Sequence, residues 1–496
     1  MKRGIRVSVY VVLGLVVLYF GAQWFLKVRI KSIVEREVYE MTHGAVKAEV
    51  GSVSLRLIGR SVWLRDVKIS SGTRSWHKKG LSLQAVEGYL DEVGVRGIHF
   101  KKRDSVIYLK AEEFGLEVSR LSADVLKQSG EAKDSLKFRV KDFDVEMKGV
   151  EVDTLSRNSG LPFSCRDIQI ALSSFLCLFA EKSQELEIGS LRLEGEQGRF
   201  AIGNIRLMPR YGMYEFAEKA AGHTDWTQVE ASGLQGTGFR LQKLLADGFA
   251  EVDSISLEKA SVRSFKNRKI GQAPRIKRLF YESVQEFPVP FAVRRIVLKD
   301  VGVEYLELAR KGLSPGKVTF NGLQGMFSDL TNRARPGQSF FSLKAKGKLM
   351  DQGEIQVVFR LPAGRENPVF EVEGWMGPLN LTALNPVLEP LAKISITSGQ
   401  MEEMTFDIRG NAQKAHVGMS FFYERLRVRI MKEKDGELET SSFLTTLANG
   451  LVVKENNPDH RGMRPGDAWA ERDPYRSQFN YLWKILLGGL KTSVGL

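Results

Sequence analysis

The chain is short of the residues that most often carry catalysis or covalent cross-links. It has two cysteines and six histidines among 496 residues. The cysteines, Cys165 and Cys177, are too few for a disulfide framework. They could close one small loop in an oxidising compartment, but two buried thiols are the favoured interpretation. No C-x-x-C, H-E-x-x-H or complete phosphate-loop pattern occurs. We therefore predict no catalytic residue, no metal site, no cofactor and no enzymatic activity.

Proline is also scarce, with 15 residues against 47 glycines, a balance that suits many short turns better than rigid linkers. With 43% hydrophobic and 27% charged residues, the chain can bury a large core and is too mixed for disorder. Its net charge of +14 permits either a solvated surface or attraction to acidic lipid headgroups. Because the basic residues are scattered and form no basic helix, nucleic acid is not expected as a partner.

The amino-terminal segment is the longest hydrophobic run in the sequence. Residues 5–26 are nearly all apolar, and about 20 such residues in a helix cross a hydrocarbon core of about 30 Å. Because the run ends in bulky residues, we expect residues 1–26 to be an uncleaved transmembrane signal anchor with the body outside the cytoplasm. A short juxtamembrane helix is predicted over residues 27–44. The anchor residues that we expect to face lipid are Val7, Val11, Leu15, Leu18 and Trp24.

Beyond residue 45 the sequence alternates apolar and polar residues with a period of two. The alternation is clear in residues 53–57, 136–140, 354–362 and 416–430. Half-buried antiparallel strands have this pattern, whereas the parallel strands of α/β enzymes read as continuous apolar runs. The sequence therefore predicts a mainly β fold built on an antiparallel sheet, with a few short helices.

One eight-residue phrase occurs four times, as "VWLRDVKI", "VEMKGVEV", "ISLEKASV" and "IVLKDVGV" at residues 62–69, 145–152, 255–262 and 296–303. Apolar residues stand at relative positions 0, 2, 5 and 7, so the alternation slips by one residue in the middle. A β-bulge at the slip would return all four to one face and bend the strand. A tight turn there would instead make ordinary hairpins, and the sequence does not decide between the two.

Helices are expected only as interruptions of the strands. Helical spacing of apolar residues predicts them over residues 274–287, 380–394, 441–451 and 474–496. The last could lie in a membrane interface, but a terminal helix docked on the end of the sheet is favoured.

The order of these features resembles the AsmA-like family of envelope proteins, which is related to TamB and the bridge-like lipid-transfer proteins. The resemblance is carried by the anchor with "GAVKAEVGSVSLRLIGRSVWLRDVKIS" at residues 44–70, and by "LNPVLEPLAKISITSGQMEEMTFDIRGNAQKAHVGMSFFYERLRVRI" at residues 384–430. It implies a β-groove over residues 45–208, a less regular middle over 209–290, an AsmA-like groove region over 291–440 and a helical segment over 441–496.

The resemblance also implies a function. The protein would be anchored in the inner membrane of a Gram-negative bacterium, with a periplasmic body that shields phospholipid acyl chains and supports outer-membrane homeostasis. The expected partners are phospholipids, the inner membrane and other envelope proteins; a structural or assembly factor that moves no lipid is the alternative. The residues expected to line the groove are the apolar members of the alternating segments: Val53, Leu55, Leu57, Val62, Leu64, Val67, Ile69, Leu136, Phe138, Val140, Val145, Met147, Ile255, Leu257, Ile296, Leu298, Val301, Val303, Ile355, Val357, Phe359, Val417, Met419 and Phe421.

Overall fold

The computed structural model describes residues 2–74, 76–78, 81–103, 106–129, 132–152, 163–179, 183–219, 225–271, 276–334, 337–364, 368–434, 437–440 and 453–496. Strands hold 62% of the chain, so the mainly β prediction is confirmed. The chain divides into two compact units. The N-terminal unit comprises Met1–Glu181, Glu185–Ala201 and Leu244–Asp247, and the C-terminal unit comprises Lys182–Gln184, Ile202–Lys243 and Gly248–Leu496.

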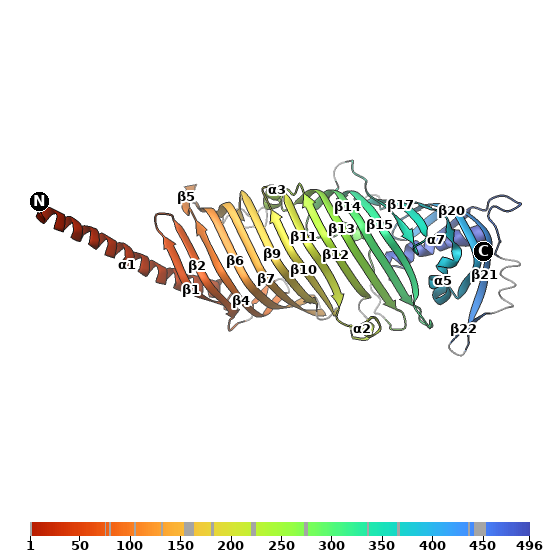
Figure 1. Ribbon diagram of the computed structural model, residues 1–496, viewed down its shortest axis with the longest axis horizontal. Helices are drawn as coiled ribbons and strands as arrows, with labels where there is room; N and C mark the ends of the chain where they lie inside the picture. Colours follow the sequence, from red (N-terminus) through yellow and green to blue (C-terminus); the bar gives the residue numbers. More distant parts are fainter. Residues whose placement is uncertain are drawn as a thin grey trace. The chain divides into compact units, whose positions relative to one another are not determined.

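The N-terminal unit is a helix followed by an antiparallel sheet (Figure 1). Strands pair as β1 with β2, β2 with β4, β4 with β6, β6 with β7 and β7 with β9, all antiparallel. Its elements are α1 (Lys2–Met41), β1 (Val46–Arg56), β2 (Ser61–Ser71), β3 (Trp76–Lys78), β4 (Leu81–Arg96), β5 (His99–Arg103), β6 (Val106–Ser129), β7 (Ala132–Val152), β8 (Phe163–Ser164), β9 (Asp167–Phe179) and β10 (Gln184–Glu194).

The C-terminal unit continues with strands and carries most of the short helices. Its elements, of which β11 and α3 also include residues of the other unit, are β11 (Arg199–Pro209), α2 (Met213–Lys219), β12 (Trp226–Thr237), α3 (Leu241–Asp247), β13 (Ala250–Asn267), α4 (Phe280–Gln285), β14 (Phe291–Leu308), β15 (Gly316–Thr331), β16 (Phe340–Leu349), β17 (Gly353–Pro362), β18 (Phe370–Met376), β19 (Leu379–Asn380), the 3-10 helix η1 (Leu381–Leu384), α5 (Asn385–Ala392), β20 (Ile394–Gly410), β21 (Lys414–Lys434), β22 (Glu437–Thr440), β23 (Gly466–Glu471) and α7 (Gln478–Val494).

One strand pair departs from the antiparallel prediction. β13 and β14 are parallel along their whole length, from the pair Ala250 and Phe291 to the pair Asn267 and Leu308. A parallel pair needs a long crossover, and the connection between these strands includes α4. The other strand pairs described within this unit, from β12 to β23, are antiparallel.

The four repeated phrases lie inside β2, β7, β13 and β14, so the turn interpretation is wrong. In β2 and β7 the slip is a left-handed backbone residue, Asp66 with φ 55° and Gly149 with φ 61°. A second slip in β7 uses Asp142, with φ 47°. A single left-handed residue bends the strand and changes the face to which the following side chains point, without ending the strand, as in a β-bulge.

The helices are partly as expected. The 380–394 segment forms η1 and α5, and the terminal segment forms α7. The 274–287 helix was predicted too long, because α4 begins only at Phe280, where the Glu282 carboxylate accepts the Leu279 backbone N–H at 2.6 Å. The 441–451 helix lies outside the described residues.

The amino-terminal helix α1 is continuous from Lys2 to Met41, so the backbone does not separate an anchor from a juxtamembrane helix. Within the described part of the chain, no helix combines the length and apolar character needed to cross a bilayer. The side chains of Val7, Val11, Leu15 and Leu18 lie outside the described residues, and Trp24 is 69% exposed.

Candidate functional site: the apolar face of the sheet

Three neighbouring strands of the N-terminal unit align their apolar residues in rows. Across β6, β7 and β9, Val118 stands opposite Phe143, and Phe143 opposite Leu172. Further rows join Leu121, Val140 and Phe175; Ala123, Phe138 and Cys177; Val125, Leu136 and Phe179; Leu116, Val145 and Ile170; and Phe114, Met147 and Ile168. Because opposite residues share a face of a sheet, these rows form one apolar surface.

The rows continue past the slip in the alternation, which we call the kink, because all three strands slip at the same level. The apolar sequence jumps from 118 to 121 in β6, from 140 to 143 in β7 and from 172 to 175 in β9, while the register stays constant. A slip in one strand alone would send its following apolar residues to the charged face. The aligned slips therefore keep the apolar surface unbroken along the strands.

This surface is partly open to solvent. Leu136, Phe138, Val140 and Met147 are half-buried, and the rings of Phe138 and Phe175 lie 6.1 Å apart. The smaller Val118, Val145 and Cys177 are fully buried. The opposite face carries charged side chains such as Arg139, which is exposed. We call the half-buried apolar side chains of β6, β7 and β9 the half-exposed face.

The C-terminal unit repeats this arrangement in β12, β13 and β14. The two phrases at 255–262 and 296–303 lie side by side in parallel register, so that Leu257 stands beside Leu298 and Val262 beside Val303. β12 slips at the same level, at Gly233, whose φ is +69°. Ile255, Leu257, Leu298, Val301 and Val303 are all half-buried.

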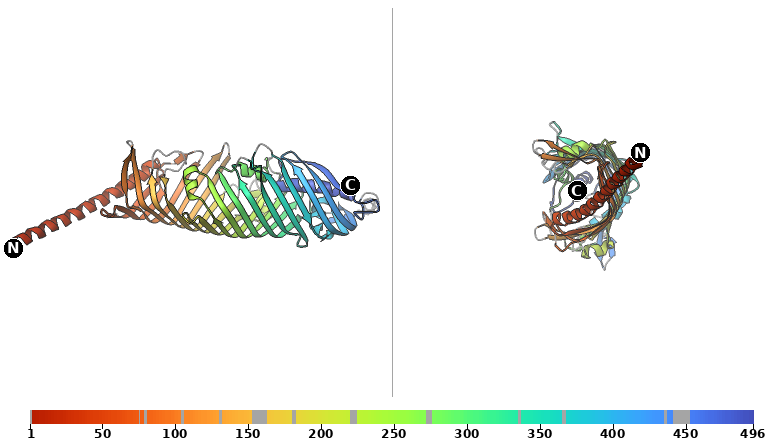
Figure 2. Two further views of the ribbon diagram at one scale, coloured as in Figure 1. Left: turned by 90° about the horizontal axis from the view of Figure 1, so that it is seen from above. Right: turned by 90° about the vertical axis from the view of Figure 1, so that its left-hand side faces the viewer.

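At the start of the N-terminal unit, a helix covers the apolar side chains. The second half of α1 lies against the sheet (Figure 2), and its Ile30, Val34 and Val38 pack on Ala48, Val50, Leu64 and Val67. Leu64 and Val67 are 8% and 3% exposed. The Val50 N–H donates to the Glu35 carboxylate at 2.9 Å, which fixes the helix to the edge strand. Val53, Val62 and Ile69 also pack against this cluster.

In the last strands of the C-terminal unit, the face is filled. Val417, Met419 and Phe421 are 0%, 4% and 4% exposed, in one core with Tyr481 and Ile485 of α7. A Cβ at Gly489 would lie 3.2 Å from both Met419 and Val417, so the helix backbone sits directly on β21. We call the apolar side chains of β20, β21 and β23 beneath α7 the covered face.

Several predicted groove residues must therefore be corrected. Leu64, Val67, Val145, Val417, Met419 and Phe421 are core residues, because protein side chains already cover them. Leu57 lies in the turn after β1, with 40% of its surface exposed. Ile296, Ile355, Val357 and Phe359 are half-buried and pack against the C-terminal core. Leu55 is half-buried in β1.

The terminal helix α7 docks on the sheet through one row of residues. Tyr481, Ile485, Gly489 and Ser493 are buried, four residues apart, whereas Phe479 is 36% exposed and touches the Tyr305 ring at 4.8 Å. Burial and the Glu307 carboxylate raise the pKa of Tyr305. Glycine and serine escape a search for apolar periodicity although they permit the closest approach.

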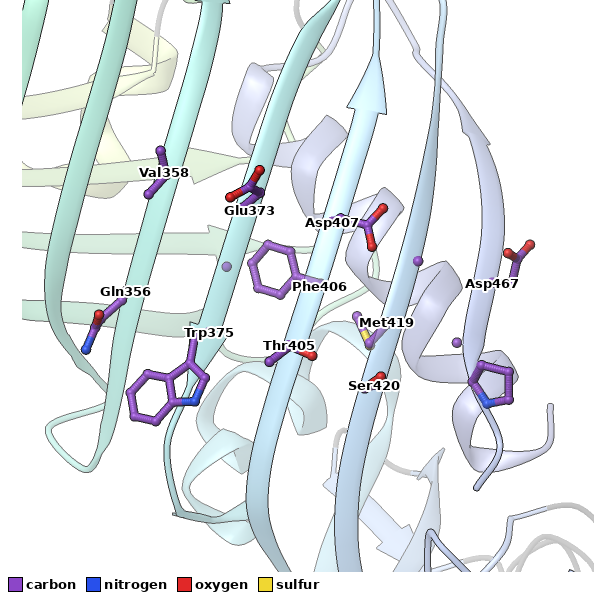
Figure 3. Close-up of a pocket in the computed structure, with 14 residues that line it drawn as sticks. Gln356, Val358, Glu373, Trp375, Thr405, Phe406, Asp407, Met419, Ser420 and Asp467 are labelled. Atoms are coloured by element: carbon purple, nitrogen blue, oxygen red, sulfur yellow. The ribbon is translucent and has the colours of Figure 1, made fainter. Parts of the chain in front are cut away.

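The opposite face of the C-terminal unit has an open depression of about 590 Å³ across β17, β18, β20, β21 and β23 (Figure 3). Its polar side chains include Glu373, Thr405, Asp407 and Asp467, beside the Trp375 indole. The Trp375 Nε1–H donates to Glu403 at 2.9 Å. Figure 3 shows α7 behind these strands, where the Gly489 backbone approaches Met419. The depression is open and has a mixed lining of polar and apolar side chains, unlike the apolar face.

Acidic residues face one another on the charged side of the N-terminal unit. Glu117 stands between Glu92 and Asp144 on neighbouring strands. Burial, then the Glu92 and Asp144 carboxylates, raise the pKa of Glu117. Burial, then Asp142 and Asp91, raise the pKa of Asp144. Both shifts follow from desolvation and like charge.

Among the residues that the structure describes, no three His, Cys, Asp or Glu side chains gather closely enough to hold a metal ion. Cys165 and Cys177 are buried thiols, and burial followed by Asp167 raises the pKa of Cys165, which disfavours a reactive thiolate. Comparison with known protein families and with curated proteins found no match.

Proposed function

We propose that the half-exposed face holds the acyl chains of phospholipids, and that the protein is a membrane-anchored, AsmA-like envelope protein. The observation that carries the proposal is the alignment of apolar rows across β6, β7 and β9, which continues through the kinks. Burial of one methylene contributes about 0.8 kcal/mol, so a long acyl chain would gain on the order of 10 kcal/mol on such a surface. The contacts are non-directional, so selectivity among acyl chains would be low.

The location is proposed from the sequence. The apolar run of residues 5–26 would anchor the chain in the inner membrane, and the body would lie in the periplasm, where lipids must cross water between two membranes. Phospholipids and the two membranes are then the expected partners.

The alternative is a structural or assembly factor that moves no lipid. The covered face favours it for the last strands, because a sheet filled by its own helix has no room for an acyl chain there. The two proposals make different predictions for the half-exposed face, which only lipid carriage requires to be accessible.

The test is to purify the full chain in mild detergent and identify co-purifying lipids by mass spectrometry. Phe138→Asp places a charge on the half-exposed face and should reduce retained phospholipid at least tenfold. Arg139→Asp, one residue away on the charged face, is the matched control and should retain wild-type amounts. Circular dichroism must show that both variants fold. Equal retention by the two variants would remove the half-exposed face as the lipid site.

A further inference from the structure

A basic cavity lies at the ends of the two parallel strands in the C-terminal unit. Because β13 and β14 are parallel, their carboxyl ends meet at one edge of the sheet. A cavity of about 510 Å³ opens there, lined by Lys266, Arg268, Arg310 and Arg476 together with the Tyr475 ring. Among the described residues that line it, none is acidic. The four cations come from three separate segments, namely the end of β13, the loop after β14 and the loop before α7.

The cations of this cavity are only partly neutralised. Arg268 donates to the Glu307 carboxylate at 2.8 Å, and Arg476 donates to Asp473 at 3.2 Å. Lys266 and Arg310 make neither a hydrogen bond nor a salt bridge with any residue that the structure describes. Among the described residues, two of the four cations thus pair directly with a carboxylate and two do not.

Lys266 is half-buried in this environment. Burial lowers the pKa of its ammonium group, and the nearby Lys277 and Arg268 lower it further, against the opposing effect of Asp225 and Glu307. Glu307 is 8% exposed, and its two oxygens already accept from Arg268 and from the Tyr305 hydroxyl, at 2.8 and 2.7 Å. A half-buried ammonium group without a direct partner is unfavourable, and a bound anion would remove that cost.

The position of Lys266 relates the cavity to the apolar face. Lys266 stands beside Glu307, and two residues back Ser264 stands beside Tyr305. Tyr305 contacts Phe479 of α7 and packs against the C-terminal core. Lys266 therefore lies on the face of the sheet that α7 covers, at the ends of strands whose apolar residues are half-buried.

We propose that this cavity binds a phosphate group carried as a phosphate ester. Guanidinium groups match the oxygens of phosphate in pairs, and a lysine adds a compact charge. Four cations from three chain segments around one volume provide donors for several oxygens, which suits a phosphate group. The ester could be a lipid headgroup or a soluble phosphate compound, and the chemistry recognised is the same. The proposal is independent of acyl-chain binding.

The decisive variant is Lys266→Gln combined with Arg310→Gln, since neither side chain makes a hydrogen bond or salt bridge with the described residues whose loss would unfold the chain. The matched control is Lys346→Gln combined with Lys348→Gln, two exposed lysines on β16 with the same change in charge. The probes are inorganic phosphate, glycerol 3-phosphate, dihexanoyl phosphatidylglycerol and, as a zwitterion, dihexanoyl phosphatidylcholine. Binding to the full chain in non-ionic detergent is measured by titration calorimetry at low and high salt.

We expect saturable binding of at least one anionic probe by the wild type and the lysine control, and at least tenfold weaker binding by the decisive variant. Salt should weaken the binding, and the probe should raise the melting temperature of the wild type and of the lysine control but not that of the decisive variant. Binding of the first two probes would indicate a soluble phosphate source, and binding of phosphatidylglycerol alone a lipid headgroup. Equal binding by the decisive variant, or no saturable binding by the wild type, would overturn the proposal. Phe138→Asp should leave phosphate binding unchanged, which separates this outcome from failure of the lipid proposal.

Discussion

The half-exposed face and the covered face are built from the same kind of strand. In β7 and in β21, apolar residues alternate with polar ones, and each strand contains a left-handed residue, Asp142 or Arg425. The difference is that the 17-residue helix α7 fills the covered face, whereas Leu136, Phe138 and Val140 of the half-exposed face are only half-buried. Identical alternation therefore leads either to a packed core or to an accessible surface, according to what else in the chain lies on it.

The sharpest test of this comparison places a photo-crosslinking phenylalanine analogue at Phe138 or at Phe421. At Phe138, on the half-exposed face, we expect crosslinked phospholipid in mass spectra of the full chain. At Phe421, which is 4% exposed beneath protein side chains, we expect crosslinks only within the protein. Comparable lipid labelling at both positions would mean that the two faces do not differ in access.

The next largest effect should come from the covered face. Ile485→Ala removes a side chain that is 0% exposed and should cost about 3 kcal/mol, because a cavity remains in the core. Hydrogen exchange of peptides from β21 and β23 should become about a hundredfold faster. Lys491 is exposed on the same helix. Lys491→Ala should change the opening free energy that exchange reports by less than about 0.5 kcal/mol. Unchanged exchange in Ile485→Ala would show that α7 does not hold these strands.

Two substitutions at a kink should change the stability by smaller amounts and in opposite directions. Asp142 has φ 47°, a conformation that glycine adopts freely and that costs a β-branched residue about 1–2 kcal/mol. We expect Asp142→Val to lower the thermal stability of the N-terminal unit and Asp142→Gly to keep or raise it. If valine were tolerated as well as glycine, the aligned slips would not depend on a left-handed residue.

The smallest expected effect concerns the charged side of the half-exposed strands. The folded-state pKa of Glu117 is raised, so its contribution to stability is present below the ordinary carboxylate pKa of about 4.3 and is lost as pH rises through the raised value. Glu117→Gln should therefore stabilise the protein at neutral pH, by about 0.3 kcal/mol. Thermal unfolding of variant and wild type at about pH 5 and about pH 7 measures this.

The matched change is Glu49→Gln, whose carboxylate stands opposite Lys68 on the next strand. Removing an attractive pair should cost a few tenths of a kcal/mol, so the two glutamate variants should differ in sign. A gain in both would show that the effect does not come from the acidic row, and it could not come from net charge, since each change makes a chain of net charge +14 more positive.

The sequence predicted much of this architecture. Alternation located β7, β17 and β21, and the slipped phrases located the kinks, because side-chain period and strand geometry are local properties. The basic run "FKNRK" at residues 265–269 could have indicated the cavity, but its partners Arg310 and Arg476 are distant in sequence. The parallel pairing of β13 and β14 also has no signature in the local sequence of either strand.

By itself, the sequence determined the strands, their two faces and the places where each strand bends, since these depend on neighbouring residues along one chain. Only the tertiary structure decided which apolar side chains are covered. Val417 and Phe138 occupy equivalent positions in alternating segments of the sequence. Val417 lies in one core with Ile485 of α7, whereas Phe138 stays half-exposed. Burial depends on contacts between residues far apart in the chain, and those contacts exist only once the helices have docked.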